Sequence, residues 1–375
     1  MESLLPKVSQ YFPNYGQSAV KNILLLSLCL LEGRTVNLYK LRGYVSRFRD
    51  KPIQPSSGYK SLIRIFDSFA YSRLWIDLLL YGFRLLRLKS DYLTMDGTSW
   101  KRHGVYRHYL TLAVIYNKIA IPIFWIDLGK KGISNTQERK KLIRRALRFF
   151  DLKGMTLLAD REYIGAEWFK YLVDNNLEFT IRLRRKDYQK AFDASSGLSY
   201  QKMIRKVERS AIRNKAMGKL VELEGRTYQL VVSKYQDHKG KVHLLLLLSS
   251  HQGKAQKIAD SYRLRWKLEC TFKHLKSNGF DMEQINLQGS ARSDLMMAVT
   301  VFTYVLSIHE GLKTYKKVRT VLRKDGTIEK TESVFRHGLD RLIALMASIG
   351  IFYHYLFHEV EQVKVKYRSN KWVNV

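Results

Sequence analysis

The sequence predicts an α/β protein, in which a mixed β-sheet with helices carries a β-rich insertion and is flanked by helical regions at both ends of the chain. Three observations predict this class. Apolar runs of helical character fill the first 89 residues. From residue 90 onward, short runs rich in β-branched and aromatic residues are typical of strands. After residue 254, apolar residues recur again at helical intervals.

Seven elements that follow residue 90 define the order of the predicted sheet. In chain order they are strands at 92–98, 108–116 and 119–128, a helix at 135–150, a strand at 155–159, a helix at 166–175 and a strand at 178–183. The short turns between the first three strands predict an antiparallel meander. The order β-β-β-α-β-α-β is that of a ribonuclease H-like core.

These elements divide the chain into four predicted parts. The stretch that follows the core is first polar and basic and then strand-like, which indicates an insertion. The predicted parts are a helical N-terminal DNA-binding region at 1–89, the ribonuclease H-like core at 90–183 and 251–312, the β-rich insertion at 184–250, and a basic helical C-terminal region at 313–375.

Charge is the most unusual property of the composition. Lys and Arg number 66 against 33 Asp and Glu, which gives a net charge of +33. Self-repulsion of this size disfavours a compact protein, so a polyanionic partner is expected. Nucleic acid is the first candidate and an anionic membrane surface the second. In the N-terminal region, basic residues between 42 and 64 fit a small DNA-binding module and a solvated basic face equally well.

Cysteine usage and hydropathy predict a cytoplasmic protein with no membrane partner. Cys29 and Cys270 are too few and too far apart for a disulfide framework, and reduced, buried thiols are expected. The apolar runs at 23–31 and 244–248 are shorter than the roughly 20 residues that span a membrane. The N-terminus does not show the pattern of a signal peptide.

Three carboxylates stand out by position. Asp96 lies near the end of the first predicted strand and Asp160 at the end of the fourth, and these two strands are neighbours in a ribonuclease H-like sheet. Glu269 lies on the helix predicted at 254–277. A single Asp that closes a strand is more often a turn-former or a cap. Convergent carboxylates, however, repel each other unless a hard cation such as Mg²⁺ or Mn²⁺ lies between them.

The predicted helix at 254–277 shows an unusual set of polar residues. At 100° per residue, one 60° sector of this helix carries Tyr262, Arg265, Glu269 and Lys276. The four residues extend over about 21 Å along the helix axis, which fits an extended polyanion better than a small ligand. The alternative interpretation, a solvated charged face, does not explain why a tyrosine shares that face.

The pattern Tyr-x2-Arg-x3-Glu-x6-Lys resembles the YREK signature of a branch of bacterial insertion-sequence transposases, which are DDE enzymes of the ribonuclease H-like superfamily. Asp96 in MDGTS and Asp160 in ADREY resemble the other two catalytic motifs of that family. The family also carries a mainly β insertion between its second Asp and its Glu. The resemblance extends from about residue 90 to residue 312.

The resemblance implies a catalytic function for the three carboxylates. Asp96, Asp160 and Glu269 would bind two Mg²⁺ (or Mn²⁺) ions and support metal-dependent strand cleavage at the element ends. The freed 3′-hydroxyl would then attack target DNA, in a cut-and-paste reaction by family analogy. The alternatives that stay open are a structure-specific nuclease on the same fold and a catalytically silent DNA-binding descendant of a transposase.

The resemblance also implies partners. Tyr262, Arg265 and Lys276 would contact phosphates near the terminal nucleotides of double-stranded DNA, and Lys273 is a weaker candidate for the same role. Two element ends must be paired, so a homodimer on DNA is expected, with the amphipathic helix at 333–346 as a candidate interface. The expected location is the bacterial cytoplasm, in association with the nucleoid when DNA is bound.

The sequence also supports expectations for three further residues. Glu162 is expected at the surface, with a role as an auxiliary metal ligand as the alternative, and His274 is expected to pack or to face solvent. Trp266 is expected in the core, with base stacking as the alternative.

Overall fold

The computed structural model describes residues 4–49, 52–102, 105–195, 197–212, 214–236, 241–323 and 326–365. The described residues form two compact units. Those within Met1–Leu88, Lys101–Gly104 and Phe272–Trp372 make the first unit, and those within Lys89–Trp100 and Val105–Thr271 make the second. The four-part division stays a prediction, and residues 366–375 of its C-terminal region lie outside the described residues.

The second unit is built on one eight-stranded sheet in the order β3-β2-β1-β4-β5-β8-β7-β6. Its strands are β1 (Tyr92–Arg102), β2 (Val105–Tyr116), β3 (Ile119–Asp127), β4 (Thr156–Ala159), β5 (Glu178–Arg182), β6 (Ala216–Leu223), β7 (Arg226–Gln236) and β8 (Val242–Ser249). β2 and β3 are antiparallel, whereas β1 pairs in parallel with β4, and β4 with β5. This is a ribonuclease H-like α/β core, as the sequence predicts.

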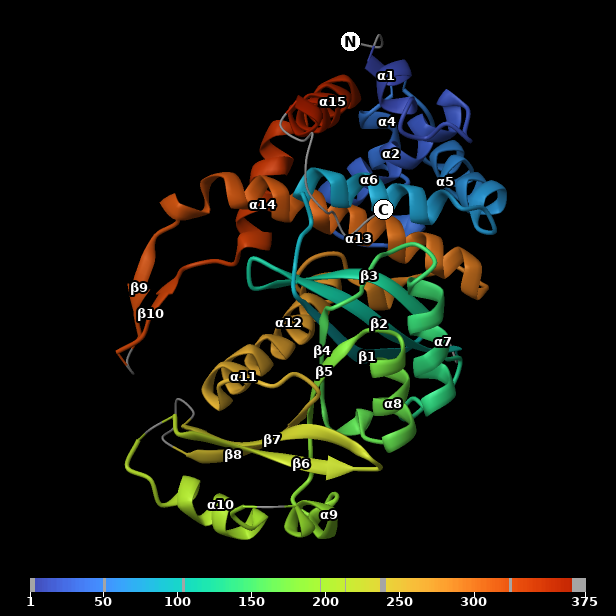
Figure 1. Cartoon of the computed structure of the whole chain (residues 1–375). Coiled ribbons are helices and arrows are strands. Elements are labelled where there is room, and N and C mark those ends of the chain that lie inside the picture. The colour runs from blue at the N-terminus through green and yellow to red at the C-terminus, as the bar shows by residue number, and fades with distance from the viewer. Residues whose placement is uncertain are drawn as a thin grey trace. The chain divides into compact units, whose positions relative to one another are not determined.

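Helices cover both faces of this sheet (Figure 1). α7 (Thr136–Ala146) packs on β2 and β3, and α8 (Ala166–Asp174) packs on β5. α7 begins with a capping box, in which the side chains of Asn135 and Glu138 each accept a hydrogen bond from the other residue's backbone N–H. On the other face, Thr271 Oγ1 donates a hydrogen bond to Ala120 O of β3 over 2.8 Å.

The β-rich insertion continues the core sheet rather than forming a separate sheet. β8 pairs antiparallel with β5, with Thr180 opposite Ser249, and β7 and β6 follow it. Two helices that the sequence analysis did not predict, α9 (Gln189–Ala194) and α10 (Tyr200–Glu208), precede β6. They lie on one side of β6–β8, and α11 (Ala255–Tyr262) lies on the other (Figure 1).

The helix predicted at 254–277 is interrupted, and the prediction of one regular helix is wrong. α11 ends at Tyr262, a 3₁₀ turn covers Arg263–Arg265, and α12 (Trp266–Leu275) follows. A 3₁₀ turn has three residues per turn, so the angles on either side of it no longer add at 100° per residue. Lys276 also lies beyond the end of α12.

The first unit is helical apart from one small hairpin. α13 (Ser290–Thr314) packs against α2 (Gln17–Gly33), α6 (Leu74–Leu86) and α14 (Val334–Leu345). The remaining helices are α1 (Leu5–Ser9), α3 (Leu38–Leu41), α4 (Tyr44–Arg47), α5 (Pro55–Phe69) and α15 (Ile349–Val365), and the hairpin is β9 (Thr320–Leu322) with β10 (Ile328–Lys330). Among the described residues, further short 3₁₀ segments lie at Arg161–Tyr163, Met282–Gln284 and Tyr315–Lys317.

The segment Ser290–Lys317 is long and apolar enough to cross a membrane, which the sequence analysis did not recognise. However, 89% of its most apolar window is buried inside the protein. The neighbouring helices α2, α6 and α14 therefore cover the surface that a lipid would otherwise contact. This is the pattern of a core helix.

The apolar face of α14 is occupied within the first unit. Phe335, Leu339 and Leu342 are at most 1% exposed, and α14 packs on α13. The amphipathic character of the helix predicted at 333–346 is therefore used for packing within the unit, and its role as a dimer interface stays a prediction.

Candidate active site

The predicted catalytic aspartates occupy equivalent places on neighbouring parallel strands. Thr94 of β1 lies opposite Leu158 of β4, and Asp96 and Asp160 each follow two residues later. The expected adjacency of the first and fourth strands is therefore confirmed. β1 continues to Arg102, so Asp96 lies within its strand, whereas Asp160 follows β4 and caps the 3₁₀ turn after it.

The Asp96 carboxylate is held on both of its oxygens. Its Oδ1 accepts a hydrogen bond from Gly97 N over 2.8 Å, and its Oδ2 accepts one from Arg265 Nη1 over 3.3 Å. A side chain at position 97 would bring a Cβ to 2.6 Å from His108 Nε2. Glycine at 97 therefore leaves room for the His108 ring against this point of β1.

Arg265 joins the carboxylates together. Its Nη2 donates to Glu269 Oε1 over 2.6 Å, while Nη1 reaches Asp96. The Arg265 side chain is only 12% exposed. The negative charge of Asp160 also acts on this guanidinium. Asp96 and Glu269 thus share one largely buried cation, and the charge of Asp160 acts on it as well.

Burial and charge shift the pKa values of this cluster. Burial raises the pKa of Asp96 to about 6; Glu269 and Glu162 add to the rise, and Arg265 and the Gly97 N–H oppose it. Burial alone would lower the pKa of Arg265, but its negatively charged neighbours raise it above the ordinary value for arginine. Arg265 is therefore fully charged and acts as the counter-ion of the site.

The type of donor at the site, carboxylate oxygen, suits a hard divalent cation, but the present arrangement of the described donors does not form a metal site. Within the described ranges, no three Asp, Glu, His or Cys side chains are arranged to hold a metal ion. The guanidinium of Arg265 instead bridges Asp96 and Glu269. The surrounding ligands are carboxylate oxygens, which Mg²⁺ and Mn²⁺ prefer.

The sequence analysis did not single out Arg182. Its Nη1 lies 3.9 Å from Asp160 Oδ1, at the end of β5. Ala159 of β4 pairs with Ile181 of β5, so the next residues, Asp160 and Arg182, lie across from each other. The adjacency of parallel strands, which predicts that Asp96 lies beside Asp160, predicts the position of Arg182 in the same way.

Glu162 is half-buried rather than a surface residue, which corrects the prediction. Its Oε1 accepts hydrogen bonds from both Ser134 N and Ser134 Oγ over 3.2 Å. Its charge contributes to the raised pKa of Asp96. Glu162 is therefore a fourth acid near the predicted site.

Tyr262 does not point to solvent as a phosphate contact would. Its side chain is 6% exposed and belongs to a hydrophobic cluster. The other buried members of this cluster are Val231, Leu245, Leu247, Ile258 and Ala259. Burial also raises the pKa of Tyr262 far above its ordinary value. In this structure Tyr262 packs α11 onto the insertion strands.

The two predicted lysine contacts belong to the first unit. Lys276 Nζ forms an ion pair there with Glu283 over 3.2 Å, and Lys273 is exposed. Their assignment to DNA phosphates stays a prediction.

Two aromatic residues near the signature differ in their surroundings. Trp266 is 50% exposed, so the prediction of core packing is wrong. His274 stacks on Phe335 with ring centroids 4.7 Å apart, which confirms packing. Burial lowers the pKa of His274 to about 4.

Residues 88–306 match the family model described as the transposase DDE domain. The match covers more than half of the chain. The chain belongs to this transposase family. No match is found among curated proteins.

A solved structure similar to this transposase is the cryo-EM synaptic complex of piggyBac transposase with hairpin DNA. The two chains are 10% identical, and the similarity covers 96% of this chain and 79% of that one with a TM-score of 0.45. The hairpin DNA belongs to the piggyBac complex, and no property of the present transposase rests on it.

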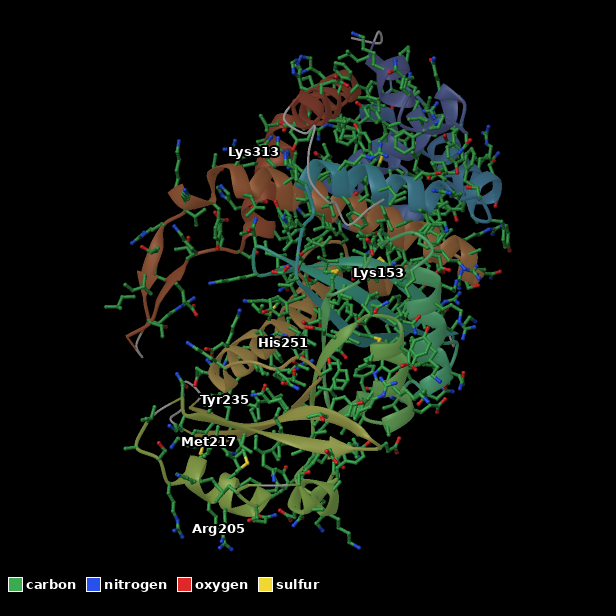
Figure 2. All side chains as sticks on the ribbon, in the orientation of Figure 1. Lys153, Arg205, Met217, Tyr235, His251 and Lys313 are labelled. Carbon is green, nitrogen blue, oxygen red and sulfur yellow. The ribbon has the colours of Figure 1, made fainter. Side chains whose placement is uncertain are left out.

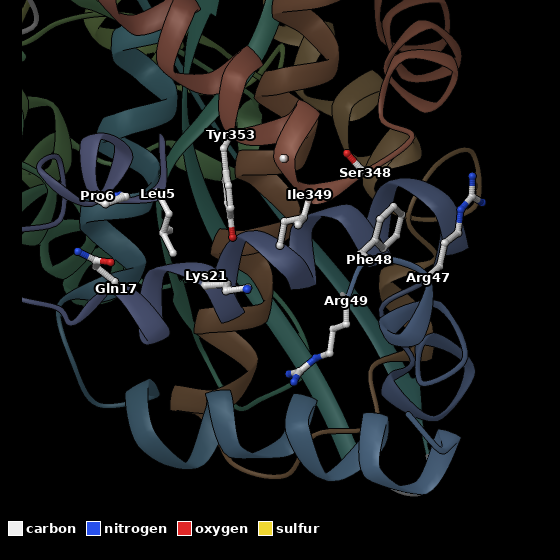
Figure 3. Close-up of a pocket in the computed structure, with 11 residues that line it drawn as sticks. Leu5, Pro6, Gln17, Lys21, Arg47, Phe48, Arg49, Ser348, Ile349 and Tyr353 are labelled. Carbon is white, nitrogen blue, oxygen red and sulfur yellow. The ribbon is translucent and has the colours of Figure 1, made fainter. Parts of the chain in front are cut away.

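The first unit of the transposase contains a basic cavity of about 510 Å³ (Figure 3). Its cations are Lys21, Arg47 and Arg49. Arg47 already pairs with Glu32, and Arg49 Nη2 donates to Ser61 Oγ over 2.7 Å. Because both arginines are engaged within the unit, we assign no ligand to this cavity.

Proposed function

We propose that this transposase belongs to the YREK branch of the insertion-sequence enzymes and moves DNA by strand cleavage at element ends followed by strand transfer. The observation that carries the proposal is the pairing of Arg265 with both Asp96 and Glu269, with Asp160 next to Asp96 at the end of the neighbouring strand. These acids come from β1, from the end of β4 and from α12. A cut-and-paste outcome is the form of the reaction that we propose.

We propose that Asp96, Asp160 and Glu269 hold two Mg²⁺ or Mn²⁺ ions. Such ions, when bound, activate water and stabilise the leaving oxygen of an in-line displacement. The protein's own contribution is to fix the acids on a rigid sheet and helix, with Glu162 adding negative charge nearby. Once other cations neutralise the acids, the Arg265 guanidinium is available to a DNA phosphate.

Double-stranded DNA is the proposed partner, both as element ends and as target. The net charge of +33 favours binding to a polyanion. Arg265, Lys273 and Lys276 are the proposed phosphate contacts, and a homodimer on DNA would pair the two ends. Tyr262 is proposed to support Arg265 from the buried cluster rather than to contact phosphate.

A nicking assay on a plasmid that carries the DNA flanking the gene tests this function. We expect the protein to nick the plasmid with Mg²⁺ or Mn²⁺ and to generate joined products. Asp96→Asn should abolish nicking, since it removes an anionic metal ligand while keeping the shape of the side chain.

Asp174→Asn is the matched control. Asp174 is an exposed aspartate that pairs with Arg226 over 2.7 Å, so its loss should leave nicking unchanged. Nicking by Asp96→Asn at the wild-type rate would contradict the proposal. Metal-dependent cleavage without any joined product would instead identify a nuclease.

A further inference from the structure

We propose that the outward face of α10 in the insertion binds the phosphate backbone of duplex DNA, as a contact surface separate from the carboxylate site. This basic face consists of Lys202, Arg205, Lys206, Arg209 and Lys215. The inference rests on the proposed function, because it takes DNA as the substrate.

The residue spacing places four of these cations on one side of the helix. Taking Lys202 as the origin, Arg205, Lys206 and Arg209 follow at offsets of three, four and seven residues, within a sector of about 100°. All four are exposed. Figure 2 shows Arg205 pointing away from the strands of the insertion.

The opposite side of α10 is fixed to the protein. Met203, Ile204 and Val207 are at most 1% exposed, and the helix packs on β6 and β7. At its N-terminus, Ser199 Oγ accepts a hydrogen bond from Lys202 N over 3.4 Å. The helix therefore cannot turn its basic face inward.

A buried lysine satisfies the C-terminal end of α10. Lys234 is 7% exposed, and its Nζ donates to Glu208 O over 3.2 Å and also to Ser210 O. This buried cation meets the negative end of the helix dipole. The surface cations of the basic face are consequently not needed for that purpose.

The basic face lines a groove of about 580 Å³ that contains no acidic residue among the described residues of its lining. Ser210 is the sixth residue of this lining. None of the five cations forms an ion pair with a residue that the structure describes. Such a concentration of uncompensated positive charge along a groove favours binding of an external anion.

The dimensions fit a DNA strand. From Lys202 to Arg209 the helix rises about 10 Å, which corresponds to about three phosphates at 3.4 Å per nucleotide along the duplex axis. Lysine and arginine side chains on one face then meet successive phosphates without reading bases. Binding through this face should therefore be independent of sequence and sensitive to salt.

The second unit contains a natural control for this face. On α7 and the turn after it, Lys141, Arg144 and Arg148 have the same residue types and the same spacing as Lys202, Arg205 and Arg209. These three side chains are also exposed. Two triple variants of equal charge can therefore be compared: K202Q/R205Q/R209Q and K141Q/R144Q/R148Q.

The test is fluorescence anisotropy of the full-length protein with a random-sequence duplex about three helical turns long, over about 50 to 200 mM salt. We expect the α10 variant to reduce the slope of log K against log salt by about two to three and to weaken binding at least tenfold. The α7 variant should change the slope by less than about one.

An equal loss of affinity and of salt slope in the α10 and α7 variants would overturn the inference, because such a loss would reflect overall charge alone. Unchanged binding by the α10 variant would overturn it as well. Binding to vesicles of phosphatidylserine and phosphatidylcholine is measured in the same way. If the protein binds vesicles more tightly than the duplex, and this binding depends on α10, the partner of the basic face is a lipid surface and the inference is wrong.

The same preparation separates this inference from the proposed function. Asp96→Asn should abolish cleavage and retain the contribution of α10 to the salt slope. If the wild-type protein does not cleave DNA but the α10 variant still shows a smaller salt slope, the DNA contact through α10 is supported and the proposed cleavage reaction is contradicted.

Discussion

At the scale of single residues, the central feature is a largely buried arginine, Arg265, that pairs with two of the three predicted catalytic acids. The sequence predicted Asp96 and Asp160 as neighbours because strand order alone places them there, and the register of β1 and β4 agrees. It did not predict that Arg265 bridges Asp96 and Glu269. Helical spacing places Arg265 next to Glu269, but the contact with Asp96 joins residues that are 169 positions apart, and no local pattern specifies it.

Replacement of this arginine tests its role as counter-ion. Arg265→Gln should lower the free energy of unfolding by about 3 kcal/mol, since it leaves two partly buried carboxylates uncompensated. Added Mg²⁺ should restore more stability to this variant than to the wild type. Denaturant unfolding with and without Mg²⁺ measures both effects.

Arg182→Gln is the control for that experiment. Its pair with Asp160 is longer, at 3.9 Å, and its side chain is 34% exposed, so the cost should stay below about 1 kcal/mol. Equal destabilisation by the two variants would show that Arg265 has no special role.

His274 makes the stability of the first unit depend on pH. Burial lowers its pKa to about 4 in the folded protein, against about 6.5 when unfolded. Between these values the unfolded state binds a proton that the folded state does not, so stability should fall as the pH drops from 6.5 towards 4. Denaturant unfolding at pH 7 and about pH 5 measures the loss.

His274→Phe should remove this part of the pH dependence, since a phenyl ring can stack on Phe335 without titrating. His251→Gln, at a half-exposed histidine, should behave as the wild type does. If His274→Phe loses as much stability on acidification as the wild type, His274 is not the group responsible.

At the scale of elements, the sequence carried more information than the predictions used. The buried side of α10 shows helical spacing in the sequence, at Tyr200, Met203, Ile204 and Val207. The polar and basic composition of this segment concealed the helix. In contrast, the break between α11 and α12 falls in Tyr-Arg-Leu-Arg-Trp, which contains neither glycine nor proline. No local signal marks that break, so it arises from tertiary contacts.

The crossing of α13 and α14 gives a prediction at this scale. A Cβ on Gly338 would collide with Ser307 O and lie 2.6 Å from Gly311 N, both in the backbone of α13. Gly338→Ala should therefore destabilise the first unit by about 3 kcal/mol, because backbone atoms must move to admit a methyl group. Thermal unfolding followed by circular dichroism measures the change.

Gly43→Ala is the control, since position 43 has helical dihedral angles and a methyl group there would meet no described atom within 4 Å. That variant should be within about 0.5 kcal/mol of the wild type. A Gly338→Ala variant as stable as Gly43→Ala would contradict the close approach of the two helices.

At the scale of the whole molecule, the chain combines a ribonuclease H-like unit with a helical unit assembled from both ends of the sequence. Strand order in the core was predictable because consecutive elements follow known connections. The pairing of β5 with β8 joins Thr180 to Ser249, and no local pattern specifies a contact over such a separation. The strands of the predicted insertion, β6 to β8, therefore extend the core sheet.

The central claim is that three acids from distant parts of the chain bind divalent cations together. Isothermal titration of the full-length protein with Mn²⁺ tests it most directly, using the wild type, Asp160→Asn and Glu269→Gln, with Asp174→Asn as the surface control. We predict that the wild type and the control bind Mn²⁺ with equal affinity and that each site variant loses at least about tenfold. Undiminished Mn²⁺ binding by both site variants would contradict the account.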